Sequence, residues 1–219
     1  MEIINLSRQR SVVSNYMAEL RDCEYQRNPL LFRNNIRRIG QMMAYEISKT
    51  LDYKEKEVTT PLGKAKCEVS SDRVVVATVL RAGLPMHDGM LCVFDKAECA
   101  FASACRVYED EAHTKVGIHV EYLAAPQLDN KVLIIADPML ATGGSMELAY
   151  KALLSHGTPN HIHLASVIAS QEGIDHIVET FPADKTTMWC AAIDSCLNAQ
   201  KYIVPGLGDA GDLCFGEKL

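Results

Sequence analysis

Residues 137–145, Asp-Pro-Met-Leu-Ala-Thr-Gly-Gly-Ser, combine backbone and side-chain groups that could bind a phosphate. Gly143 and Gly144 let the backbone turn tightly and approach a ligand without interference from a Cβ atom. Thr142 and Ser145 offer hydroxyl groups, and the helix predicted to follow would present unpaired N–H groups and a partial positive charge. Because the helix dipole alone contributes only about 0.3–1 kcal/mol, most of the affinity would come from individual N–H and O–H bonds.

This segment differs from the commonest nucleotide-binding loops. No lysine follows the glycines, as a Walker loop requires, and the spacing is not Gly-x-Gly-x-x-Gly. For residues 142–145 taken alone, an ordinary strand-to-helix turn with Ser145 as the N-cap is an equally good interpretation. Asp137 favours a ligand site, because it directly follows an apolar run and its carboxylate could accept hydrogen bonds from two neighbouring sugar hydroxyls.

Two further segments carry polar groups beside apolar runs. Residues 80–84 read Leu-Arg-Ala-Gly-Leu, and Arg81 could present paired donors to a diphosphate, although alone it is better interpreted as an exposed arginine in a turn. Residues 202–212 read Tyr-Ile-Val-Pro-Gly-Leu-Gly-Asp-Ala-Gly-Asp, a composition that predicts an ordered loop. Asp209 and Asp212 resemble calcium ligands, but the rest of the EF-hand spacing is absent.

Short apolar runs predict the strands that must position these segments. They read as strands buried on both faces, as in a parallel sheet. The four runs are Val74–Leu80, Val132–Ala136, Ile162–Ala169 and Thr187–Ile193. Helical patterns lie between them, so we expect an α/β fold with a parallel central sheet flanked by helices. Ligands of such sheets bind beyond the carboxyl ends of the strands, which is where Arg81 and Asp137 stand.

Two more elements are expected before the first buried strand. Residues 33–51 show a helical period, with Ile36, Ile39, Met43 and Ile47 recurring on one face. Residues 55–69 alternate on both sides of a Pro-Leu-Gly turn, which predicts a β-hairpin arm. Because a two-stranded hairpin is marginally stable alone, we expect it to pack against something else, such as a second subunit.

The loop after the second strand resembles the loop that binds 5-phosphoribosyl-1-diphosphate (PRPP) in type I phosphoribosyltransferases. Purine and orotate members usually carry two adjacent acids before this loop, whereas this chain has a single acid followed by proline. In that respect residues 137–145 resemble the uracil phosphoribosyltransferase family letter for letter. Residues 80–84 and 202–212 are similar to the diphosphate-binding and uracil-binding segments of the same family, and the likeness extends over nearly the whole chain.

This resemblance implies a type I phosphoribosyltransferase fold and the conversion of uracil and PRPP to UMP and diphosphate, a step of pyrimidine salvage. We expect Arg81, Asp137 and Asp209 to be catalytic. The residues implied to bind PRPP are Arg81, Arg106, Asp137, Pro138, Met139, Leu140, Ala141, Thr142, Gly143, Gly144, Ser145 and Asp209. Those implied to bind uracil are Tyr202, Ile203, Gly208, Asp209 and Ala210. Mg²⁺ is expected to be bound mainly through PRPP, with no metal site of the protein's own.

The chain departs from the family pattern in two places. The N-terminal His-Pro-Leu common in the family is missing, with residues 10–12, Arg-Ser-Val, near that place. The mobile loop that closes over PRPP is expected within residues 105–126, and it begins Cys-Arg-Val-Tyr-Glu-Asp instead of with a Tyr-Arg-Asn-like sequence. Arg106 is the best match to the loop arginine. The alternatives are a phosphoribosyltransferase for another base and a non-catalytic homologue that binds a nucleotide and regulates.

The composition limits which partners and which cellular compartment can be expected for the protein. The chain has 219 residues with a net charge of −6, which predicts a single domain over 1–219 and argues against nucleic acid or an anionic membrane as a partner. Its eight cysteines form no Cys-x-x-Cys pair, and no signal peptide is expected, so reduced thiols and a cytoplasmic location are predicted. A homodimer or higher homo-oligomer is expected, with GTP as a candidate effector.

Other metal-binding patterns are weaker. The set Cys99, Cys105, His113 and His119 fits no structural zinc spacing. His161 and His163 alternate on one predicted strand without a third ligand nearby, so packing or surface roles are the simpler interpretation.

Overall fold

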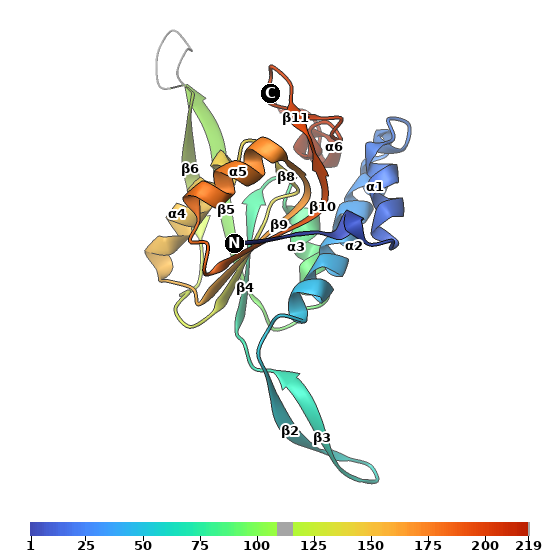
Figure 1. The fold of residues 1–219 in the computed structure, drawn as a ribbon, viewed down its shortest axis with the longest axis vertical. Coiled ribbons are helices and arrows are strands. Elements are labelled where there is room, and N and C mark those ends of the chain that lie inside the picture. Colours follow the sequence, from blue (N-terminus) through green and yellow to red (C-terminus); the bar gives the residue numbers. More distant parts are fainter. Residues whose placement is uncertain (109–115, 219) are drawn as a thin grey trace.

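The computed structural model describes residues 1–108 and 116–218, and for residues 104–108 and 116–120 it describes the backbone alone. Its centre is an eight-stranded sheet in the order β1-β10-β9-β7-β4-β5-β6, with β8 beside β9 (Figure 1). Neighbouring strands run parallel except β5 and β6. The strands are β1 (Glu2–Asn5), β4 (Val74–Leu80), β5 (Glu98–Tyr108), β6 (Val116–Ala124), β7 (Val132–Ala136), β8 (Met139–Leu140), β9 (His161–Ser170) and β10 (Thr186–Asp194).

Helices cover both faces of the sheet, as the apolar strands require. On one face lie α1 (Val13–Arg21), α2 (Pro29–Ser48) and α3 (Leu84–Leu91), and on the other lie α4 (Gly144–Leu153) and α5 (Gln171–Thr180). Alternate residues of one strand serve the two layers: Val74 and Val76 pack with the first set, Val75 and Ala77 with the second. The predicted α/β fold with a mostly parallel sheet is confirmed.

The order of the strands creates a crevice at one edge of the sheet. After β4 the chain crosses through α3 to β5 on one side, and it later returns to β7 on the other side of β4. Thr78 is in register with Ala136, so β4 and β7 end side by side. Crossovers that leave in opposite directions from neighbouring strands leave open space above their carboxyl ends, where ligands of such folds bind.

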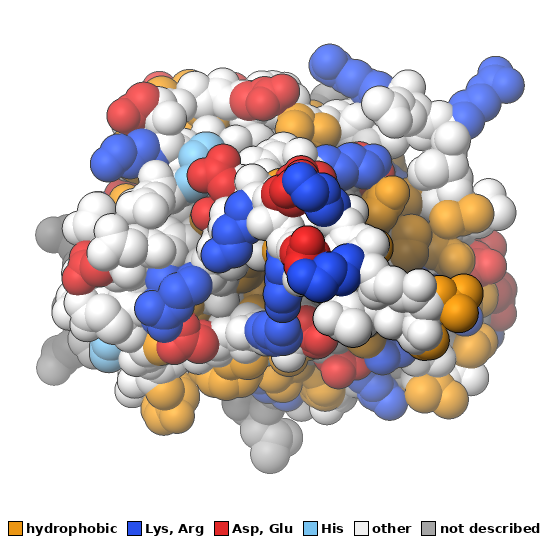
Figure 2. Space-filling model, turned by 90° about the horizontal axis from the view of Figure 1, so that it is seen from below, with side chains coloured by type: hydrophobic (Ala, Val, Ile, Leu, Met, Phe, Trp, Pro, Cys, Tyr) orange, Lys and Arg blue, Asp and Glu red, His pale blue; other side chains and the backbone are white. Residues whose placement is uncertain are grey.

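The predicted hairpin is present as β2 (Tyr53–Thr60) and β3 (Gly63–Ser70), which project away from the body of the molecule (Figure 1). Its strands are joined by cross-strand ion pairs, with Lys64 Nζ 2.6 Å from Glu57 Oε1 and Lys66 Nζ 2.8 Å from Glu55 Oε1. Seen along the arm, basic and acidic side chains are interleaved on this end of the molecule (Figure 2). Leu62, at the tip, is fully exposed.

Two expected boundaries change in the structure. The helix expected over 33–51 is α2 over Pro29–Ser48, because Asn28 caps its start by accepting from the Leu30 and Leu31 N–H groups and proline suits the first helical position. The loop expected within 105–126 is in large part the antiparallel pair β5 and β6. In β6, apolar residues alternate with other types over residues 116–121, a period-2 pattern that the sequence interpretation missed.

Small elements complete the chain. Near the C-terminus β11 (Cys196–Leu197) pairs antiparallel with β12 (Ile203–Val204) and precedes α6 (Ala210–Phe215). Short 3-10 turns are η1 (Leu6–Arg8), η2 (Tyr25–Arg27) and η3 (Leu154–His156). None of the helices described in this structure is long and apolar enough to span a membrane.

Helices α2 and α3 approach each other backbone to backbone. A Cβ atom added at Gly89 would lie 2.0 Å from the Arg37 carbonyl oxygen, and one added at Gly40 would lie 2.5 Å from that of Met86. Neither neighbour is a side chain that could rotate away. The two glycines therefore set the distance between these helices.

We predict that Gly89→Ala lowers the free energy of unfolding by about 1–3 kcal/mol in urea titration, the usual effect of overpacking a core. Alanine in a helix gains only ~1 kcal/mol over glycine, which a clash with fixed backbone outweighs. Glu179→Ala, at an exposed position of α5, is the control and should change stability by less than about 0.5 kcal/mol. A Gly89→Ala protein as stable as the parent would show that the two helices separate easily.

Candidate active site

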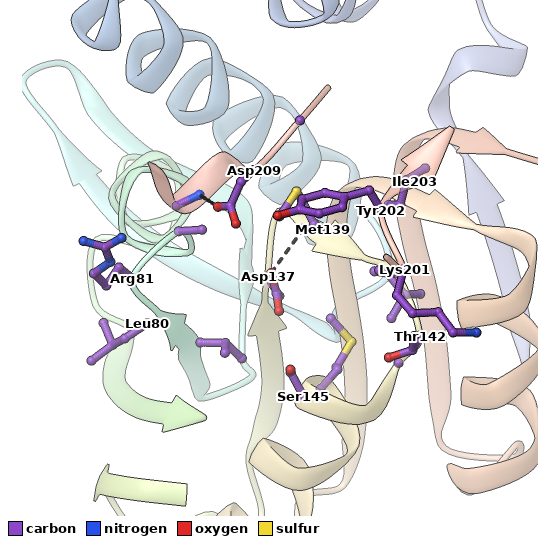
Figure 3. A pocket seen from close by; sticks show the side chains of 18 of the residues that line it. Leu80, Arg81, Asp137, Met139, Thr142, Ser145, Lys201, Tyr202, Ile203 and Asp209 are labelled. Atoms are coloured by element: carbon purple, nitrogen blue, oxygen red, sulfur yellow. Dashed lines mark hydrogen bonds between the residues drawn. The ribbon is translucent and has the colours of Figure 1, made fainter. Parts of the chain in front are cut away.

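A cavity of about 900 Å³ lies at the carboxyl edge of the sheet, above the ends of β4 and β7 (Figure 3). Most of its lining comes from three segments, each overlapping one that the sequence singled out: residues 79–82, residues within 137–146, and residues within 200–211. Segments far apart in the chain thus meet around one space, large enough for a nucleotide-sized ligand.

The glycine-rich loop presents an open helix start to this cavity. Gly143 is the N-cap residue of α4 with φ +83°, a left-handed conformation that glycine adopts at little cost, and no side chain in the described part of the protein caps the helix. Ser145 lies inside the first turn, so the alternative that made it the N-cap is wrong. Its hydroxyl and the first N–H groups of the helix are left for a ligand.

Helix α5 supports the glycine-rich loop on the side away from the cavity. Ser170 Oγ donates to the Ala141 carbonyl at 2.6 Å and also accepts from the Gly173 N–H at the start of α5. His176, on the next turn of α5, lies against Gly143, where an added Cβ would come within 2.7 Å of its ring. The same histidine is 2.8 Å from Glu147 Oε2 on α4. The loop is therefore a supported structure rather than a free turn.

Asp137 stands at the base of the cavity, directly after β7. Its backbone N–H donates to the Ala165 carbonyl, and its Oδ1 accepts from the Met139 N–H at 3.1 Å. The carboxylate faces the cavity and is otherwise enclosed by protein. This burial raises the pKa of Asp137 to about 7, against the opposing effect of the Met139 hydrogen bond.

Arg81 lies on the other side of the cavity, directly after β4 (Figure 3). Its Nη2 donates to Asp212 Oδ1 and to the Gly216 carbonyl, each at 3.1 Å. Its Nε is buried and has no hydrogen-bond partner among the residues that the structure describes. Because only Nη2 donates to residues that the structure describes, this guanidinium beside the cavity has donors left for an anionic ligand.

The third wall is the segment before α6. Asp209 Oδ1 caps α6 by accepting from the Gly211 and Asp212 N–H groups at 2.8 and 3.1 Å, which leaves Oδ2 available to the cavity. Tyr202 lies over the cavity close to Met139 (Figure 3). Ile203 and Gly208 border the same space.

A partly buried ion pair fixes this wall to the body of the protein. Arg21, at the end of α1, donates to both carboxylate oxygens of Asp194 at 2.8 and 2.7 Å and to the Gly206 carbonyl at 2.9 Å. Asp194 also accepts from the Gly206 N–H, and Gln26 donates to the Leu207 carbonyl. Burial would raise the pKa of Asp194, but the hydrogen bonds from Arg21 and Gly206 outweigh it and hold the pKa below its ordinary value.

Most of the residues predicted from sequence line the cavity. Those brought together there are Arg81, Asp137, Met139, Leu140, Ala141, Thr142, Gly143, Ser145, Tyr202, Ile203, Gly208 and Asp209. Pro138, Gly144 and Ala210 belong to the same segments but do not border the cavity. Arg106 falls on β5, and its side chain lies outside the described residues, as do residues 109–115 of the expected loop.

Sequence interpretation missed several residues of the site. Lys201 borders the cavity, as do Gln200, Ser103 and Lys218. The Arg21–Asp194 pair was also missed, although Asp194 shows the signal that marked Asp137: an acid at the carboxyl end of an apolar strand. Its partner is far away in the chain, so no local spacing could have revealed the pair.

Possible metal ligands are scattered. Within residues 1–108 and 116–218, no three His, Cys, Asp or Glu side chains gather as a metal site would need. His163 Nδ1 accepts from Trp189 Nε1 at 3.0 Å, and burial together with the charge of His161 lowers the pKa of His163 to about 3. Of the zinc set considered, His113 lies outside the described residues, and so do the side chains of Cys105 and His119.

Comparison with known proteins gives a consistent result. Residues 7–217, which include all three segments around the cavity, match the sequence profile of the family described as uracil phosphoribosyltransferase. A uracil phosphoribosyltransferase of Porphyromonas gingivalis is 56% identical over 219 residues, 100% of both chains. One of Methanothermobacter thermautotrophicus is 41% identical over 191 residues, 86% of this chain and 85% of that relative. A solved structure, the AQ2163 protein from Aquifex aeolicus, superposes with a TM-score of 0.86 at 31% identity and 98% coverage of both chains.

We predict that Asp137→Asn makes the protein more stable at neutral and alkaline pH. The carboxylate is ionised in the unfolded chain above pH ~4 but in the folded protein only above about 7, so its ionisation opposes folding increasingly between these values. The stability gained by the variant over the parent should rise from pH 4 to pH 8 by on the order of 2–4 kcal/mol, measured by urea unfolding at each pH.

The matched control is Asp184→Asn, in an exposed turn, for which no comparable rise between pH 4 and pH 8 is expected. Equal pH dependence of the parent and Asp137→Asn would mean that the carboxylate at the base of the cavity ionises as freely as one in water.

Proposed function

The chain belongs to the uracil phosphoribosyltransferase family, and we propose that the cavity above β4 and β7 is where it converts uracil and PRPP to UMP and diphosphate. The protein is a pentosyltransferase. The observation that carries the assignment of the site is the meeting of Arg81, Asp137 and the open start of α4 around one cavity. These groups match the anionic and hydroxyl groups along PRPP.

The 5′-phosphate of PRPP binds at the loop of residues 141–145. Its oxygens accept hydrogen bonds from the free N–H groups at the start of α4 and from the hydroxyls of Thr142 and Ser145. Asp137, at the start of the same loop, accepts hydrogen bonds from the ribose 2′- and 3′-hydroxyl groups. Ionised Asp137 is the form with acceptors for both hydroxyls, so PRPP binding lowers the raised pKa of this carboxyl.

The diphosphate of PRPP binds at Arg81. In the free protein Asp212 and the Gly216 carbonyl hold Nη2 of the guanidinium, and the partly exposed side chain borders the cavity. Asp212 is partly exposed, and an exposed ion pair contributes only about 0–1 kcal/mol. A diphosphate with several negative charges therefore competes well for Arg81.

Uracil binds against the third wall. Its edge of carbonyl and N–H groups is read by backbone groups at Ile203 and from Gly208 to Ala210, and Tyr202 lies beside the base. The Arg21–Asp194 pair and Gln26 keep this backbone in place. Asp209 Oδ2, the oxygen that the α6 cap leaves available, orients either the base or the ribose.

The reaction needs positioning and charge stabilisation more than a strong base. The lone pair of uracil N1 forms the bond to C1′, the C1′–oxygen bond breaks, its electron pair leaves on diphosphate, and the N1 proton is released. Arg81 stabilises the negative charge that grows on the leaving diphosphate. The segment before α6 holds the base and the glycine-rich loop holds the sugar phosphate, so that the reacting atoms are in line.

Mg²⁺ fits this arrangement as a companion of PRPP. Mg²⁺ is usually bound through one or two carboxylates together with substrate phosphates, and Asp137 and Asp209 are two carboxylates facing one cavity. When bound, the ion would neutralise part of the diphosphate charge. The protein's own residues supply the rest of the binding.

We further propose the setting in which the enzyme works. It is a single catalytic domain in the cytoplasm, acting in pyrimidine salvage; the seven cysteines that the structure describes are all free thiols. The exposed arm of β2 and β3 packs against a second copy to form a homodimer, because a lone hairpin with an apolar tip is poorly stable in water.

The test is to mix the purified protein with PRPP and Mg²⁺ and to measure nucleotide formation from uracil, hypoxanthine, adenine and orotate in parallel, with and without GTP. UMP from uracil alone is the expected result. A nucleotide from a different base would overturn the substrate, and PRPP binding without any product would favour a regulatory role. A rate changed by GTP would identify it as an effector.

We predict that Arg81→Ala lowers kcat/KM for PRPP at least tenfold, about 1.4 kcal/mol, because the growing charge on diphosphate loses its cation. The KM for uracil should change little. Arg73→Ala is the matched control, since Arg73 precedes the other end of the same strand and pairs with Glu98 on the surface. If both variants behave like the parent, Arg81 has no part in holding the diphosphate.

A further inference from the structure

Lys201 borders the cavity from a turn that holds its backbone firmly. Asn198 Oδ1 accepts from the Gln200 and Tyr202 N–H groups at 3.0 and 2.9 Å, and the Lys201 N–H donates to the Asn198 carbonyl at 2.9 Å. Within this turn Lys201 has φ +63°, a left-handed conformation that residues other than glycine adopt uncommonly. The side chain of Lys201 therefore starts from a fixed position on the rim of the cavity.

From this turn the side chain reaches α5, the helix that supports the glycine-rich loop. Lys201 and Thr142 border the same cavity (Figure 3). Its Nζ lies 3.0 Å from Glu172 Oε1, at the start of α5. The next residue, Gly173, is packed so closely on the loop that an added Cβ would lie 2.5 Å from the Ala141 carbonyl oxygen. The ammonium group is therefore held against the helix that supports the loop.

The charges around the cavity show what Lys201 could supply. The loop of residues 137–145 contains no basic side chain, yet a phosphate bound there carries up to two negative charges. Among the described residues that line the cavity, the cations are Arg81, Lys201 and Lys218. Arg81 bonds to Gly216, two residues before Lys218, so the C-terminal end lies on the diphosphate side. Lys201 is the cation beside the loop.

We propose that Lys201 is a substrate-binding residue that exchanges Glu172 for the 5′-phosphate of PRPP and UMP. Both partners of the Lys201–Glu172 pair are half-exposed, and exposed pairs of this kind stabilise little. A bond between an ammonium and a phosphate is charge-assisted and stronger. The proposal rests on the assignment of the loop as the 5′-phosphate site and deepens it.

The experiment compares UMP with uridine, which lacks the phosphate. UMP binding is measured by titration calorimetry, and uridine binding by competition against UMP, for the parent protein and four variants. Lys201→Met should weaken UMP binding about tenfold and leave uridine binding unchanged, and Lys201→Arg should restore most of the affinity for UMP. Glu172→Gln, which frees the ammonium group, should bind UMP as tightly as the parent or more tightly.

The matched control is Lys49→Met, which removes an exposed Lys–Glu pair of similar length, 2.7 Å, outside the cavity and should leave both ligands unaffected. If Lys201→Met and Glu172→Gln weaken UMP binding equally, the ion pair only stabilises α5. If Lys201→Met weakens the binding of UMP and uridine equally, Lys201 does not interact with the phosphate. Either result would overturn this inference and leave the proposed function standing. A parent protein that binds no UMP would overturn the proposed function with it.

Discussion

The parallel pairing of β4 with β7 is the constraint on which the rest of the site depends. Because Thr78 is in register with Ala136, the two strands end together, and whatever follows each must share one edge of the sheet. One strand is followed by an arginine and the other by an aspartate. A shift by one residue would turn every side chain of a strand to the opposite face, so the apolar layers above and below the sheet also hold the register that places the two charges.

Two cations of the cavity, Arg81 and Lys201, are held by acids in the free protein. Arg81 is paired with Asp212 and Lys201 with Glu172, and in each pair the acid belongs to a helix outside the glycine-rich loop. A long basic side chain with no partner would sample many rotamers, and ordering it would cost entropy when substrate binds. Partly exposed pairs limit that freedom while remaining easy to exchange, which suits a protein that must bind and release charged molecules in every turnover.

The sequence was informative where the chemistry is local. The turn at Gly143, the acid after β7 and the hairpin arm each depend on residues close together in the chain, and each was predicted at its observed place. The Arg21–Asp194 pair and Lys201 could not be found in this way. The first joins residues at opposite ends of the chain, and the second lies beside the loop only because α5 and the turn at Asn198 are brought together by the sheet.

The strand pair β5 and β6 was missed for a different reason. The residues of β6 alternate with the period of a strand, but the region was assigned from its likeness to a family in which it is a mobile loop. The N-terminal start of α2 was also placed late. Asn28 marks it by capping backbone N–H groups and Pro29 by its fixed φ, and neither contributes to the apolar periodicity that identified the helix.

The bond between Arg21 and Asp194 joins the wall where we propose that the base binds to the first helix of the chain, while the loop proposed for the sugar phosphate is supported by α5 instead. On that proposal, the two halves of the ligand are gripped by parts of the protein that can vary independently. Substitutions near the N-terminus could alter which base is accepted without disturbing the grip on phosphoribose. A lineage that changed its base could thus conserve the chemistry of its sugar.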